Sequence, residues 1–215
     1  MDRPYVVGID IGGQSAKIGI VDTRGTVLSQ TAIKSNDTNS HVEFIDNLCS
    51  AVEKLAEKAN IPMSKIRGIG IGAPNANYYT GTIENAVNLT FGGMKVIPFA
   101  DLMSERIGLP VRLTNDANAA AVGEMTYGAA RGMKNFITIT LGTGVGSGIV
   151  VGGYVLYGHD GFAGELGHVT MVRKNGRLCG CGKTGCLEAY ASATGVARTA
   201  RELLETTDKK SVLRN

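Results

Sequence analysis

Three cysteines and one histidine stand close together in the stretch 164–188, which reads GELGHVTMVRKNGRLCGCGKTGCLE. Cys179, Cys181 and Cys186 offer soft sulfur ligands, and His168 precedes them. A structural zinc ion takes four such ligands in a tetrahedron, and the glycines between the cysteines allow a short loop to turn its thiolates inward. Because a closed set of four protein ligands leaves no position for water, the pattern indicates a structural rather than a catalytic metal.

Two further interpretations of these cysteines remain open, namely ordinary reduced thiols in a loop or a disulfide. Cys179 and Cys181 are too close in the chain for an unstrained disulfide, and any disulfide among three cysteines leaves one unpaired. The spacing therefore favours a zinc site.

A second candidate for chemistry is Asp116, in the run 114–121, TNDANAAA. The run is typical of a helix N-cap, because an Asn or Asp side chain accepts hydrogen bonds from the first free N–H groups of a helix. Alternatively, a carboxylate at the end of a strand points into a cleft and accepts the proton of a hydroxyl group that attacks phosphorus. The two interpretations are compatible with each other.

Two glycine-rich turns offer bare backbone N–H groups, which suit phosphate oxygens. The first covers residues 12–15 and is flanked by Lys17 and by Asp10, a carboxylate suited to hold magnesium through water; a glycine pair of this kind is more often only a turn. The second covers residues 142–148 and invites a dinucleotide-binding interpretation, which requires a helix after the glycines. Residues 149–157, IVVGGYVLY, favour a hairpin instead, and the chain has no Walker-type G-x-x-x-x-G-K-[ST] motif.

Apolar periodicity predicts the elements that position these residues. Three β-rich runs joined by turns read as an antiparallel meander, and a stripe of apolar residues at helical spacing predicts an amphipathic helix soon after them. The glycine- and asparagine-rich stretch 72–88 reads as a loop. The expected strands are 5–10, 16–22, 26–34, 66–71, 111–113 and 136–141, and the expected helices are 41–60, 98–107 and a segment after Glu188.

Composition sets the limits on the class of protein. At 215 residues the chain is one large domain or two small ones, and a hydrophobic fraction of 43% is enough to bury a core. A net charge of +3 without a run of Lys or Arg weighs against a dedicated nucleic-acid binder. The start has no signal-peptide pattern and no long apolar span follows, while cysteines used as metal ligands favour a reducing cytoplasm.

The motifs GExGH at 164–168 and CxCGxxGCxE at 179–188 resemble the signature of the ROK family of bacterial sugar kinases and repressors. The resemblance runs from about Tyr5 to the end of the chain. It implies an α/β protein with an actin-like ATPase (ribonuclease H-like) fold. The small N-terminal domain is expected at residues 1–114, followed by an incomplete large domain with a zinc loop at residues 115–215, which lacks the C-terminal third of the family's usual form.

The resemblance also implies roles for individual residues. Asp116 would be the general base, and Gln14 departs from the threonine that the family usually has in its first glycine hairpin. The implied sugar ligands are Asn88, Asn115, Asp116, Glu165, His168 and Glu188. The implied nucleotide contacts are Asp10, Gly12, Gly13, Gln14, Lys17, Gly142, Thr143 and Gly144. The implied ligands of a structural Zn²⁺ are His168, Cys179, Cys181 and Cys186.

The implied activity is ATP-dependent phosphorylation of a hexose, with Mg²⁺ accompanying ATP and with glucose as the favoured substrate. Kinases for N-acetylmannosamine, N-acetylglucosamine and fructose share these motifs, so these three sugars also remain open as substrates. Two functions without catalysis remain open as well, namely a sugar-sensing regulator that has no kinase activity and a zinc-stabilised sugar-binding module. Family members are commonly homodimers, so a second copy is an expected partner, whereas nucleic acid and membranes are not.

Overall fold

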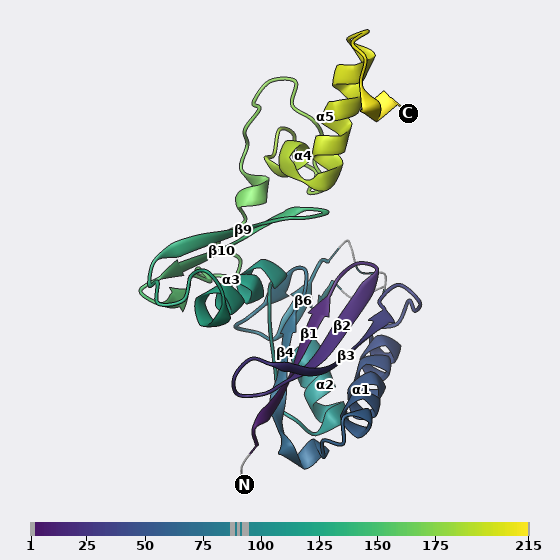
Figure 1. Cartoon of the computed structure of the whole chain (residues 1–215), viewed down its shortest axis with the longest axis vertical. Helices are drawn as coiled ribbons and strands as arrows, with labels where there is room; N and C mark the ends of the chain where they lie inside the picture. The colour runs from purple at the N-terminus through teal and green to yellow at the C-terminus, as the bar shows by residue number, and fades with distance from the viewer. Residues whose placement is uncertain (1–2, 87–88, 90, 92–94, 215) are drawn as a thin grey trace.

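The computed structural model describes residues 3–86, 89, 91 and 95–214 of the chain. Its first half is built on a sheet with the strand order β3-β2-β1-β4-β8, seen in the lower part of Figure 1. The predicted antiparallel meander is confirmed, and β4 and β8 run parallel to β1. The strands are β1 (Tyr5–Ile11), β2 (Ser15–Val21), β3 (Val27–Lys34), β4 (Ile66–Gly72) and β8 (Val111–Thr114).

Alternation along the strands separates the two faces of this sheet, because successive side chains of a strand point to opposite sides. Val7, Ile9 and Ile11 of β1 are buried in the core against α1 (His41–Lys58) and α2 (Phe99–Ile107). The intervening Gly8 and Asp10 lie on the other face and are exposed. The sheet therefore turns its apolar side to the two helices and keeps its polar and glycine positions on the open side.

A second, small sheet lies where the sequence predicts only a loop. It consists of β5 (Ala76–Asn77), β6 (Thr82–Glu84) and β7 (Val96–Ile97), with the short helix η1 (Met63–Lys65) placed before β4. The loop prediction for residues 72–88 is wrong at β5 and β6, because such short strands have no detectable period and are held by pairing with their neighbours.

The second half begins with α3 (Asp116–Tyr127), which packs on the hairpin of β9 (Phe136–Leu141) and β10 (Val145–Val151). The predicted hairpin after the second glycine turn is confirmed, because β10 pairs antiparallel with β9 and with β11 (Tyr154–Val155). In Figure 1, α3 lies between this sheet and the first one.

The chain then passes through η2 (Leu166–His168) and a long loop into α4 (Glu188–Ala191), α5 (Ala193–Glu205) and the short η3 (Val212–Arg214). These helices lie at the opposite end of the long axis from the N-terminus in Figure 1. Across the described residues, none of the helices combines the length and the apolar character that crossing a bilayer requires.

Candidate active site

The candidate base Asp116 is the first residue of α3, and only Asn115 separates it from the end of β8. The Asn115 side chain caps the helix by accepting from Ala117 N at 2.9 Å, and Asp116 Oδ1 accepts from the same N–H at 2.8 Å. The Asp116 carboxylate remains accessible to solvent, yet the surrounding protein removes enough water to raise its pKa. The Ala117 N–H opposes that rise and the Asp10 carboxylate adds to it. The N-cap interpretation is therefore confirmed, and Asp116 also lies at the end of a strand, as its proposed role as a base requires.

Four ionisable groups from three segments of the chain interact electrostatically. Burial raises the pKa of Glu165, the His168 imidazole lowers it, and the carboxylates of Asp116 and Glu188 raise it further. Glu165 immediately precedes η2 and His168 is its last residue, whereas Glu188 begins α4 and Asp116 begins α3, so these groups come from three different parts of the chain. The fold thus gathers three carboxylates and an imidazole within interaction range.

The Glu188 side chain also contacts the second glycine turn. Its Oε2 accepts from Val145 N at 2.9 Å, and a Cβ on Gly144 would lie only 2.6 Å from the same oxygen. Gly142 is held from the other side, because its carbonyl accepts from Ala193 N at 2.9 Å. The turn that carries Gly142, Thr143 and Gly144 is therefore fixed by the segment that follows the cysteine loop.

The first glycine turn is fixed by a residue that the sequence does not single out. The buried Ser35, just after β3, donates from its hydroxyl to Gly12 O at 2.6 Å and from its N–H to Gln14 O at 3.1 Å. Asp10 and Lys17 are cross-strand partners below that turn. Because a serine at the end of a strand carries no distinctive pattern, its role is visible only in the folded chain.

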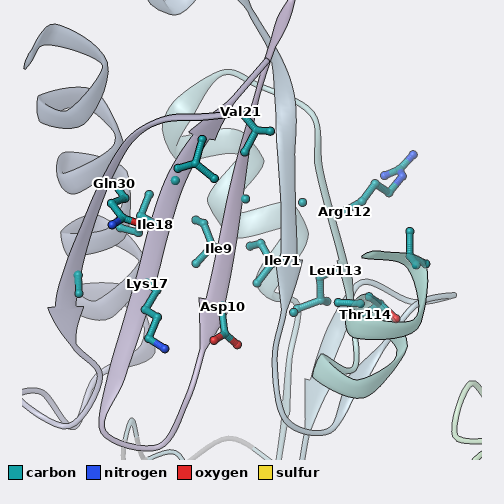
Figure 2. Close-up of a pocket in the computed structure, with 18 of the residues that line it drawn as sticks. Ile9, Asp10, Lys17, Ile18, Val21, Gln30, Ile71, Arg112, Leu113 and Thr114 are labelled. Carbon is teal, nitrogen blue, oxygen red and sulfur yellow. The ribbon is translucent and has the colours of Figure 1, made fainter. Parts of the chain in front are cut away.

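A groove of about 1010 Å³ covers the open face of the first sheet, and Figure 2 shows the side chains that line it. Most of its lining is apolar or glycine, but Asp10 and Lys17 lie at one end and point toward the first glycine turn (Figure 2). Thr114, which precedes Asn115, also lines the groove. The polar end of the groove therefore adjoins the carboxylate cluster, since Asp10 acts on the Asp116 carboxylate.

The four candidate metal ligands converge as the sequence predicts. Their ligand atoms all lie within 4.8 Å of one another. Cys179 Sγ lies 3.7 Å from His168 Nδ1, and Cys181 Sγ lies 3.7 Å from Cys186 Sγ. A tetrahedral zinc ion with Zn–S bonds near 2.3 Å places its ligand atoms about 3.8 Å apart, so the residues fit this ion. Glu188 Oε1 lies 3.6 Å from Cys179 Sγ, which puts the carboxylate cluster directly beside the metal ligands.

Arg177 fastens the cysteine loop to the helices behind it. Its guanidinium donates to Ala189 O at 3.1 Å, to Gly195 O at 3.2 Å and to Thr199 Oγ1 at 2.9 Å, and it lies over the ring of Tyr190. These contacts hold α4, and with it Glu188, against the loop that carries the cysteines. A single arginine in a polar stretch gives no sequence signal of such a role.

The site as the structure describes it leaves out one predicted sugar ligand. Asn88, a predicted sugar ligand, falls outside the described residues. Phe91, three residues further along the chain, is buried in the core and stacks on Phe44 at a centroid distance of 4.7 Å. Phe91 is therefore a packing residue of the first half.

Comparison with known proteins matches this arrangement to one family. The profile of the ROK family matches residues 6–215. A glucokinase of Halalkalibacterium halodurans is 45% identical over 94% of this chain, and the chain spans 60% of that relative's length. A putative xylose repressor of a Caldicellulosiruptor species is 31% identical over 93% of the chain, which spans 49% of that protein.

Solved structures similar to this chain also belong to the ROK family. A ROK family glucokinase from Streptomyces griseus, in complex with glucose and AMPPNP, superimposes with a TM-score of 0.79 at 37% identity, covering 94% of this chain and 62% of that one. A ROK family transcriptional regulator, a homologue of the E. coli MLC protein, gives a TM-score of 0.83 at 26% identity, covering 97% and 52%. The expected actin-like ATPase fold is confirmed by these neighbours, and the chain belongs to the ROK family.

Proposed function

We propose that the protein phosphorylates a hexose with ATP and that its favoured substrate is glucose. The observation that carries this proposal is the convergence of four groups, Asp116, Glu165, Glu188 and His168. Glu188 accepts a hydrogen bond at the second glycine turn, and Asp10, next to the first turn, acts on Asp116. The glucokinase names of the similar proteins, and the glucose and AMPPNP in the Streptomyces griseus structure, support the same activity.

The proposed reaction begins with a sugar hydroxyl beside Asp116. As the hydroxyl oxygen forms a bond to the γ-phosphorus of ATP, its proton passes to the Asp116 carboxylate, and the bond to the ADP oxygen breaks. Burial raises the proton affinity of Asp116, which suits a general base. A raised pKa thus serves the step that needs a proton acceptor.

The remaining residues bind the two substrates in this proposal. The two glycine turns would donate backbone N–H groups to phosphate oxygens, Lys17 would add positive charge, and Asp10 would help to hold the Mg²⁺ that accompanies ATP. The proposed sugar ligands are Asn88, Asn115, Glu165, His168 and Glu188. The proposed phosphate contacts are Asp10, Gly12, Gly13, Gln14, Lys17, Gly142, Thr143 and Gly144.

The proposed zinc ion has a structural role. His168 Nδ1 faces the sulfur ligands, so metal binding there would leave Nε2 free to meet a sugar hydroxyl and would hold the ring in one orientation. Three cysteine thiolates as metal ligands are compatible with a reducing cytoplasm. The resemblance further supports a homodimer, with the chain divided into domains at residues 1–114 and 115–215.

A second candidate function is sugar sensing without catalysis. The likeness to a xylose repressor and to a transcriptional regulator supports it. The presence of Asp10, Lys17 and Asp116 together favours the kinase, because sugar sensing alone requires neither a base nor phosphate ligands.

The test is an ADP-release assay of the complete protein that carries this sequence, with a panel of hexoses and N-acetylhexosamines. Turnover with one sugar is expected, and Asp116→Asn is expected to keep sugar binding while losing turnover. Wild-type turnover in Asp116→Asn refutes the base assignment. Sugar binding without any turnover in the wild type favours the sensor.

A further inference from the structure

The loop that carries Glu165 has little regular structure of its own. Gly158, Gly161 and Gly164 adopt left-handed conformations with φ of 75°, 86° and 91°, so the chain changes direction repeatedly before η2. A loop of this kind does not fix a carboxylate by itself, and its position depends on the elements to which it is anchored.

One anchor belongs to the second half of the chain. The Ser147 hydroxyl of β10 donates to Gly164 O, immediately before Glu165. Because β10 also packs against α3, this contact ties the C-terminal end of the loop to the element that carries Asp116.

The other anchor belongs to the first half of the chain and consists of three consecutive residues, Asn77, Tyr78 and Tyr79. Asn77 of β5 is 6% exposed, and its Nδ2 donates to Asp160 O at 3.0 Å across 83 residues of sequence. The Tyr79 hydroxyl donates to Gly158 O at 3.0 Å, and the ring of Tyr78 stacks on that of Tyr157 at 4.3 Å with an interplanar angle of 2°. We call this set of contacts the clasp; it joins Asn77, Tyr78 and Tyr79 of the first half of the chain to residues 157–160 of the second half.

The clasp is built around Asn77. Its Oδ1 accepts from Tyr79 N at 3.0 Å and its Nδ2 also donates to Glu84 Oε1 at 3.1 Å, so the side chain is held in one orientation. Gly161 packs so closely on this amide that a Cβ there would lie 2.5 Å from Asn77 Oδ1. The loop that precedes Glu165 is therefore anchored to the first half of the chain by the clasp and to the second half by Ser147.

We infer that Asn77 and Tyr79 are positioning residues for the sugar. Their hydrogen bonds hold the loop that carries Glu165 against the half of the chain that contains the first phosphate turn. The inference rests on the proposed hexose kinase function. In this arrangement Glu165 is anchored to Asp116 through β10 and to the first sheet through the clasp. The sugar hydroxyls are thereby aligned with both the base and the phosphates.

The test compares Tyr79→Phe with Tyr154→Phe in the complete protein. Tyr79→Phe removes only the hydroxyl of a residue that is 60% exposed, whereas Tyr154→Phe makes the same chemical change at a residue of β11 that is 80% exposed and lies outside the clasp. The readouts are KM for the hexose that the wild type uses best, KM for ATP, kcat, the Kd of that hexose by calorimetry without ATP, and the melting temperature.

Loss of one hydrogen bond is expected to raise the sugar KM and Kd about 2- to 10-fold in Tyr79→Phe, with ATP KM and melting temperature unchanged. Asn77→Ala is expected to raise them further, since it removes two donors and one acceptor, and Tyr154→Phe is expected to match the wild type. Unchanged sugar KM and Kd in both clasp variants overturn the inference. An equal rise of both KM values with a lower melting temperature also overturns it, because that is the effect of general destabilisation.

Failure of the kinase proposal can be distinguished from failure of this inference. If the wild type binds the hexose without turnover, the kinase proposal fails and the Kd comparison still decides the inference. If the wild type neither turns over nor binds any hexose, both are overturned, because there is no sugar to position.

Discussion

Gly148 of β10 decides how closely α3, and therefore Asp116, approaches the sheet of β9, β10 and β11. A Cβ at this position would lie 2.5 Å from Ala121 Cβ and 2.8 Å from Ala117 O. Favourable carbon–carbon contacts lie at about 3.5–4.0 Å, so Gly148→Ala forces a separation of about 1 Å between helix and strand. Both contacting residues belong to α3, which begins at Asp116.

The expected cost follows from this displacement. Overpacking of a core costs about 1–3 kcal/mol, which lowers the melting temperature of a chain of this size by about 2–12 °C. A base misplaced by about 1 Å costs on the order of 100-fold in turnover. We therefore expect Gly148→Ala to lower both the melting temperature and kcat, as measured by calorimetry and by ADP release.

Gly123→Ala is the matched control, because Gly123 lies in the same helix and a Cβ there would meet nothing within 4 Å. Replacing a helical glycine by alanine stabilises by about 0.5–1 kcal/mol, so this variant is expected to melt higher and to keep its turnover. The double variant Gly148→Ala/Ala121→Gly removes the closest contact and is expected to regain part of the lost stability. If Gly148→Ala melts and turns over like the wild type, the close approach of α3 and β10 does not position the base.

Two further predictions concern the metal and the proton. The purified chain is expected to hold one zinc ion, measured by atomic emission, and Cys181→Ser is expected to lose the ion and to melt at a lower temperature. Cys49→Ala, which alters a buried thiol of α1, is the control and is expected to retain the ion. A metal-free wild type refutes the site. Burial raises the pKa of Asp116, and a general base acts only when it is deprotonated. We therefore expect kcat/KM to be at its maximum at neutral pH and, as the pH is lowered, to fall at a higher pH than it would with an ordinary Asp side chain, whose pKa is about 3.9. A pH profile that stays flat down to about that value refutes the assignment.

The raised pKa of Asp116 has a consequence for stability as well. Its pKa is higher in the folded than in the unfolded chain, so the folded state binds the proton more readily and the ionised carboxylate opposes folding at neutral pH. A site that needs a desolvated base therefore holds it at some loss of stability, which the well-packed core of α1, α2 and the first sheet offsets.

Local patterns in the sequence are sufficient for much of this protein. Three β-rich runs joined by turns along residues 5–34 predict the meander, and helical spacing predicts α1 to within two residues of its observed end at Lys58. The β-branched run after the second glycine turn correctly predicts a hairpin instead of a helix. Three cysteines and a histidine of the right chemistry predict a convergent ligand set, because few other arrangements use them. Each of these features depends on residues close together in the chain.

Other features depend on contacts between distant segments, and the sequence is silent about them. The Glu188 carboxylate meets Val145 N across 43 residues, and the Asn77 amide meets Asp160 O across 83 residues. Neither contact has a local period, a cap or a turn signal. Likewise, the sequence does not tell whether Phe91 lines a site or packs in the core, and only the stacking of its ring on Phe44 shows that it packs. The sequence by itself determines which groups are available for chemistry, and only the tertiary structure decides which of them meet, because the contacts that position them join segments that no local pattern relates.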